Sequence, residues 1–160
     1  MGQKVIRVRN ILGERLSLPG GVTRERAVQE AGKRVETLRA PYEEAIAVEI
    51  AKLEKIVAAA GPEIAARQLA QLLDGAGRLL TLTGTFGFAL LDAVSKSLCD
   101  LCVGMLEKSI AATAPLEVHL NAMRLAWKME LSETEAEEML GELARIHVHY
   151  GFEPHKPDES

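Results

Sequence analysis

The chain has few aromatic residues, only two cysteines and no long uncharged apolar run. Aromatic residues make up 4% of its 160 residues, whereas hydrophobic residues make up 48%. Much of this apolar content is alanine and leucine, which favour helix. The composition therefore predicts helices packed closely on small side chains. It excludes a disordered chain, which needs low hydrophobicity, and the length predicts one domain with a real core.

No secretory or membrane-inserting segment is expected. The opening residues are charged and no apolar stretch follows them, which argues against a signal peptide. The least charged stretch, residues 79–106, is interrupted by Asp92, Lys96 and Asp100, so we expect no membrane insertion. The predicted location is the cytoplasm.

Charge is unevenly distributed along the chain. The net charge is −4, yet residues 1–40 carry nine basic and four acidic residues. Either the basic part lies on an acidic helix of the same chain or it contacts an acidic protein, with Arg7, Arg9 and Arg15 as candidate contact residues. Nucleic acid is not expected as a partner, because no aromatic residues are interleaved with the basic ones.

The pattern of hydrophobic residues predicts an all-α fold, a helical bundle of five to six helices with a short extended N-terminal arm. We expect an extended basic arm over residues 1–22, the bundle over residues 23–150, and a flexible tail over residues 151–160, which contains two prolines.

The first predicted helix begins after Thr23, which can cap it, and covers residues 24–40. Pro41 either kinks this helix or starts the next one, over residues 41–61. That second segment has a 4-3-4 apolar series, and Glu49 is expected on the opposite face. The series consists of Ile46, Ile50, Leu53 and Val57.

Later helix boundaries follow from proline, glycine and serine. Pro62 is expected to open a helix over residues 62–82, in which Gly75 and Gly77 mark a close helix contact or a bend. Residues 83–87 are predicted as a turn. The next helices are expected over residues 88–112 and 115–130 and from Ser132, where "SETE" forms a capping box. The apolar stripes of the helices over 62–82 and 88–112 are Leu69, Leu72, Ala76 and Leu79, and Leu91, Val94, Leu98, Leu101 and Met105.

The two cysteines form a C-x-x-C at Cys99 and Cys102. Redox pairs normally lie at a helix N-terminus, where the dipole lowers the thiol pKa, but this pair falls in mid-helix. No second cysteine pair completes a zinc site. We interpret both residues as packing residues, with Cys102 inside the apolar stripe and Cys99 at its flank. Redox sensing or metal sensing through this pair is the alternative.

His119 raises the possibility of histidine phosphotransfer, which uses an exposed histidine in a helical bundle. The sequence "HLNA" lacks the lysine and glycine that follow such a histidine, and His119 falls within the apolar arc of its helix. We interpret it as an interior or interface histidine, with phosphotransfer as the alternative. His147 is expected near the core and His149 outward, which argues against a metal site between them.

The helix over residues 115–130 carries two apolar stripes on nearly opposite sides. Val118, Leu125 and Met129 belong to the second stripe, which must be shielded from solvent by other residues. We expect these residues to be buried either by an internal helix or across a twofold dimer interface.

No catalytic triad, carboxylate pair or phosphate-binding loop is present in the sequence. We therefore expect no catalytic residue, no cofactor and no metal site, and we predict a nonenzymatic protein.

Residues 10–39, "NILGERLSLPGGVTRERAVQEAGKRVETLR", and the later "LEVHLNAMRLAW" give the chain a family resemblance. It resembles CheE-type proteins, small accessory proteins of alphaproteobacterial chemotaxis operons, in its short basic arm, its Pro-Gly-Gly turn followed by threonine, and the helix ending near "VETLR". The resemblance implies a role in chemotaxis signalling through contact with a response-regulator or kinase-type protein. It implies no functional residues.

Overall fold

A computed structural model describes residues 23–152, and these residues form five α-helices and no strand, as expected for an all-α bundle. The helices are α2 (Arg24–Ala60), α3 (Ala66–Phe86), α4 (Ala89–Glu107), α5 (Ala114–Lys128) and α6 (Glu133–His149). The predicted arm over residues 1–22 and the tail beyond residue 152 lie outside the described residues. The chain divides into two units, Met1–Arg39 and Ala40–Ser160.

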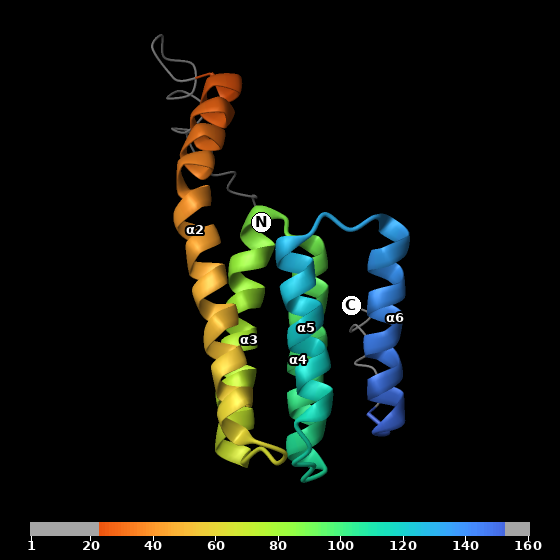
Figure 1. The fold of residues 1–160 in the computed structure, drawn as a ribbon. Coiled ribbons are helices and arrows are strands. Elements are labelled where there is room, and N and C mark those ends of the chain that lie inside the picture. The colour runs from red at the N-terminus through yellow and green to blue at the C-terminus, as the bar shows by residue number, and fades with distance from the viewer. Residues whose placement is uncertain (1–22, 153–160) are drawn as a thin grey trace, which may run out of the picture. The chain divides into compact units, whose positions relative to one another are not determined.

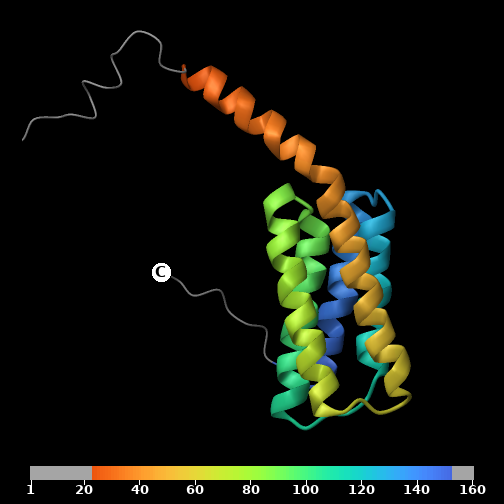
Figure 2. The same ribbon diagram turned by 90° about the vertical axis from the view of Figure 1, so that its left-hand side faces the viewer.

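Four helices and the second half of α2 make up the second unit. Helix α3 packs against α4, α4 against α5, and both α4 and α5 against α6. Figures 1 and 2 show these helices running along one another. The apolar series predicted in residues 46–57, 69–79 and 91–105 are all buried, so the 3.6-residue periodicity correctly identified the core.

Two helix starts agree with their predicted caps. The Oγ1 atom of Thr23 accepts a hydrogen bond from the N–H of Arg26 over 3.3 Å. Ser132 and Glu135 form the reciprocal capping box at the start of α6. Both caps satisfy N–H groups that have no partner within the helix.

The predicted turn at residues 83–87 is wrong, because α3 continues through Phe86. The hydroxyls of Thr81, Thr83 and Thr85 each donate to the carbonyl four residues earlier, so these residues follow the helix instead of breaking it. The helix ends at Gly87, whose φ of 75° is the left-handed conformation that glycine adopts without strain.

Of the two alternatives for Pro41, the start of a new helix is wrong, and the predicted start of a helix at Pro62 is wrong as well. Pro41 lies inside α2 and starts no new helix. Pro62 does not begin α3 either, because the segment after it pairs with the connection between α4 and α5: the N–H of Ile64 donates to the carbonyl of Ala111 over 2.7 Å. Helix α4 ends at Glu107 and not at residue 112, because Ser109 has a left-handed φ of 55°.

Glu49, expected on the polar face of α2, is buried with 5% of its surface exposed. Its carboxylate accepts hydrogen bonds from Arg78 on α3 and from Lys52 on its own helix. Burial acts to raise the pKa of Glu49, but the bonds from Lys52 and Arg78 outweigh it and lower the pKa. The ion pair satisfies the buried charge, so the expectation based on polarity alone was wrong.

Residues 151 and 152, predicted as part of the flexible tail, pack on the bundle instead. Phe152 is buried, and its ring packs directly over Gly104 of α4, where a Cβ atom would lie 2.7 Å from the ring. Lys108 donates to the carbonyl of Gly151 and lies over the Phe152 ring. Residues 151 and 152 therefore belong to the bundle.

Candidate functional site

The most polar part of the bundle interior centres on His119. This residue of α5 has no exposed surface. Its Nδ1 atom lies 2.8 Å from the carbonyl oxygen of Pro115, and since a carbonyl only accepts, Nδ1 carries the proton. Burial lowers the pKa of His119 to about 4, although the bond to Pro115 acts in the opposite direction. The ring is therefore neutral at pH 7, and its Nε2 is an acceptor.

Ser97 connects His119 with a second histidine. The Oγ atom of Ser97, on α4, lies 3.0 Å from Nε2 of His119 and 3.1 Å from Nε2 of His147, on α6. Because Nε2 of His119 accepts, the Ser97 hydroxyl donates to it and receives a bond from His147. We call His147, Ser97 and His119 the histidine–serine chain. It links three helices through one hydroxyl.

A serine next to a histidine is also the arrangement of a nucleophile and its base. Here the Ser97 oxygen is already engaged by His147, and the far side of His119 bonds to a backbone carbonyl instead of a carboxylate. Ser97 also lies in the middle of α4, where backbone N–H groups are bonded within the helix and cannot stabilise an oxyanion. The arrangement favours a structural tie over nucleophilic catalysis.

A groove of about 290 Å³ between α4 and α6 reaches the histidine–serine chain. It is lined by Ala93, Lys96, Ser97, Asp100, Leu140, Ala144, His147 and Val148. Burial lowers the pKa of His147, and Asp100 partly counteracts this. The groove gives solvent a route to His147, while His119 stays enclosed.

The two interpretations of His119 require different environments: phosphotransfer needs an exposed ring, and a structural role allows a buried one. A phosphoryl acceptor needs a ring nitrogen that a donor can reach, but both nitrogens of His119 are bonded and the ring is enclosed. The geometry therefore favours the interior histidine over phosphotransfer.

The cysteines occupy the predicted positions. Cys102 is fully buried in the core and Cys99 is half-buried at its flank. Burial raises the pKa of Cys99 to about 11 and that of Cys102 to about 12, with smaller contributions from Asp100 and from Cys99 respectively. Both thiols are protonated at pH 7, which favours packing over thiolate chemistry.

His147 is buried and His149 is exposed, as predicted from their helix. His149 packs against Tyr150, with ring centroids 5.1 Å apart. Among residues 23–152, no three histidine, cysteine or acidic side chains lie together as a metal site would require.

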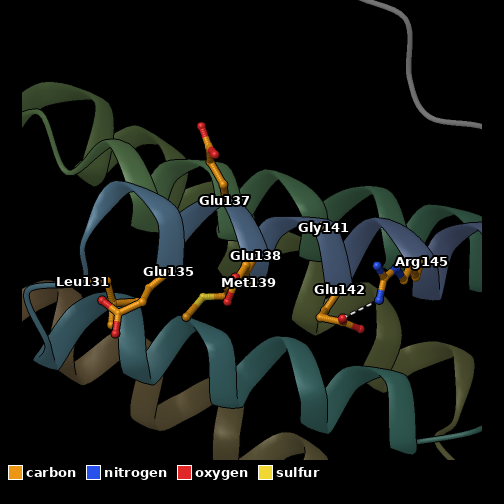
Figure 3. A pocket seen from close by; sticks show the side chains of 8 residues that line it. All are labelled: Leu131, Glu135, Glu137, Glu138, Met139, Gly141, Glu142 and Arg145. Carbon is orange, nitrogen blue, oxygen red and sulfur yellow. Dashed lines mark hydrogen bonds and ion pairs between the residues drawn. The ribbon is translucent and has the colours of Figure 1, made fainter.

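A hollow of about 790 Å³ follows the acidic face of α6 (Figure 3). Glu142 forms an ion pair with Arg145 over 2.6 Å, and Glu135 caps the helix through Ser132. Glu137 and Glu138 are exposed, and Figure 3 shows them on different sides of α6. The glutamates of α6 are thus exposed to solvent, and two of them are engaged by the helix's own groups.

The second stripe of α5 is not covered by another described helix. Val118, Leu125 and Met129 are 44%, 43% and 53% exposed, so the alternative of an internal helix covering them is wrong. Helix α6 packs elsewhere, through Leu143 and His147. A dimer interface over these residues stays a prediction.

The first unit contains a surface that the sequence interpretation overlooked. In residues 24–39 of α2, Val28, Val35 and Leu38 are 65%, 48% and 50% exposed, and Ala31 is exposed as well. Their 3-4-3 spacing is visible in the sequence, but this spacing is common to bundle helices and does not by itself indicate exposure. We call these four residues the α2 stripe. The candidate partner-contact residues Arg7, Arg9 and Arg15 lie outside the described residues.

None of the described helices is long and apolar enough to cross a membrane. In the comparisons with known proteins, no family model, no curated protein and no solved structure matches this chain.

Proposed function

We propose that this chain is a nonenzymatic protein-interaction module of bacterial chemotaxis signalling that binds a response-regulator or kinase-type protein in the cytoplasm. The observation that carries the proposal is the α2 stripe. Three large apolar side chains on one helix segment, each about half exposed or more, form a surface of the kind that protein partners cover.

The remaining polar groups support binding over catalysis. The histidine–serine chain is bonded internally, and the thiols are buried and protonated. No buried side-chain nitrogen or oxygen in the described part of the chain lacks a hydrogen-bond partner. Catalytic sites usually retain reactive groups that a substrate can reach, so surface contact is the simpler function.

The chemotaxis setting comes from the resemblance of residues 10–39 to CheE-type proteins. This stretch includes the whole α2 stripe, Val28 to Leu38. The basic candidates Arg7, Arg9 and Arg15 precede it in the chain and would steer an acidic partner toward it.

The test is binding to purified chemotaxis response regulators and kinases of the source organism, measured by biolayer interferometry. We expect binding by the full chain and a loss of about tenfold or more for Val35→Asp with Leu38→Asp. Gln29→Asp, on another face of the same helix, should bind normally. Charge reversal at Arg7 and Arg9 should slow association at low salt only. Absence of binding to every such protein would contradict the chemotaxis proposal.

A further inference from the structure

The α2 stripe has the spacing of a two-helix seam. Val28, Ala31, Val35 and Leu38 follow one another at intervals of three, four and three residues, which places them on one narrow face of α2. A broad apolar arc favours packing into a core, whereas so narrow a seam suits one partner helix. The occupant of the stripe is therefore best described as a single helix.

Charges beside the stripe determine which helix fits. Arg34 and Arg39 lie on its two flanks, in the positions that face the partner's flanks in a coiled coil. They are five residues apart. In a parallel pair of identical segments, Arg34 of one helix would therefore face Arg39 of the other.

In an antiparallel pair, Arg34 of one helix would face Arg34 of the other, whereas Arg39 would face Glu25. Arg34 thus meets an arginine in both arrangements, which disfavours pairing of the segment with itself. Glu36 forms an ion pair with Arg39 over 3.3 Å but lies further around the helix. Arg34 makes its own flank basic toward a partner, while Arg39 shares its charge with Glu36.

We infer that the α2 stripe binds one amphipathic helix of another protein, with apolar residues in its seam and glutamate or aspartate on its flanks. This inference rests on the proposed interaction function and specifies the partner's chemistry. An acidic flank of the partner pairs with Arg34, and the partner's apolar seam covers Val35 and Leu38.

Two designed three-heptad peptides test the inference with the full chain. Both have leucine and valine in the seam; one has glutamate in every flanking position and the other has lysine. Fluorescence anisotropy should give binding of the glutamate peptide at least about tenfold tighter than of the lysine peptide, with the difference shrinking at high salt.

Two variants with the same charge change form the control pair. Arg34→Glu removes a flanking charge and should weaken binding of the glutamate peptide about tenfold or more. Lys33→Glu lies on the opposite face and should have little effect. Val35→Asp should abolish binding of both peptides, while circular dichroism checks that helix content is kept.

Several results would overturn the inference. These are equal binding of the two peptides, equal effects of Arg34→Glu and Lys33→Glu, or self-association of the chain that Val35→Asp abolishes. Failure to bind the glutamate peptide, with binding to vesicles of phosphatidylcholine and phosphatidylserine instead, would assign the stripe to a membrane surface.

The proposed chemotaxis function and the acidic-helix inference can be contradicted independently of each other. If chemotaxis proteins bind through Val35 and Leu38 but the glutamate peptide does not, the acidic-helix inference is wrong and the interaction function stands. If the glutamate peptide binds and no chemotaxis protein does, the inference holds and the chemotaxis setting is wrong.

Discussion

The rings of His119 and His147 lie with their centroids 5.5 Å apart, and both face the hydroxyl of Ser97. They come from α5 and α6, which contact each other directly and are both bonded to Ser97 of α4. Because this contact needs His119 in its neutral form, we expect the stability of the bundle to depend on pH.

Acid should destabilise the bundle through His119. Its pKa is about 4 in the folded chain and near 6.5 when unfolded, so the unfolded state binds the extra proton first. The stabilising contribution is present above pH 6.5 and is lost as the pH falls from 6.5 toward 4, by about 3 kcal/mol. Urea unfolding across this range should show the decline, and His119→Gln should flatten it. An unchanged decline in His119→Gln, or a flattened one in the exposed control His149→Gln, would contradict this.

Ser97→Ala should destabilise the chain more than Ser95→Ala. Removing the Ser97 hydroxyl leaves Nε2 of His119 and Nε2–H of His147 without a partner, at a cost of about 2 kcal/mol. Ser95 is fully buried but donates only to the carbonyl of Leu91 in its own helix, so its loss should cost below about 0.5 kcal/mol. Chemical unfolding of both variants makes the comparison, and equal losses would argue against the histidine–serine chain.

Gly75→Ala and Gly77→Ala should have opposite effects on stability. An added Cβ at Gly75 would lie 2.5 Å from Cδ2 of Leu53 and 3.1 Å from a carboxylate oxygen of Glu49, so we expect a loss of about 2 kcal/mol. At Gly77 nothing lies within 4 Å, and alanine should raise helix stability by about 0.5–1 kcal/mol. Thermal melting distinguishes the two, and a stabilising Gly75→Ala would mean that α2 and α3 are not in close contact there.

Both thiols should react slowly with iodoacetamide in the folded chain at pH 8. Their pKa values of about 11 and 12 leave little thiolate, and Cys102 is enclosed. In urea both should react at the rate of a free cysteine. Cys99 should be the faster of the two in the native chain, as mass spectrometry after timed quenching can determine. Rapid native alkylation of either cysteine would contradict the packing interpretation.

The sequence predicted the parts of the structure that depend on one helix at a time. Apolar spacing identified the buried series around Leu98, and local residues identified the caps at Thr23 and Ser132. Prediction from sequence failed where side chains that are distant in the chain contact each other. Glu49 is buried because Arg78 lies opposite it, 29 residues away, and nothing in the pattern of α2 alone could predict that partner.

The same distinction holds for the candidate site: positions on a single helix were predictable, and contacts between helices were not. Helical position was sufficient to predict that His119 is interior and that His147 points inward. Ser97 was overlooked because its role depends on three helices meeting at one point, and serine in mid-helix gives no local signal. The turn prediction at residues 83–87 failed because it used local preference alone, whereas Thr83 is buried and donates a hydrogen bond to Asp92 of α4 over 2.8 Å.

Leu125→Glu should separate a dimer without unfolding the chain. Leu125 is 43% exposed, and no described helix covers it, so a charge there need not be buried within one chain. If the stripe of Val118, Leu125 and Met129 forms a twofold interface, the new carboxylates would be buried at that interface, which is costly. Light scattering should then give a dimer mass for the natural chain and a monomer mass for the variant, with native helix content by circular dichroism. Val148→Glu is the matched control, because Val148 is 73% exposed on α6 and should leave the dimer intact. A natural chain that is monomeric at all accessible concentrations would show that this face of α5 is not a dimer interface.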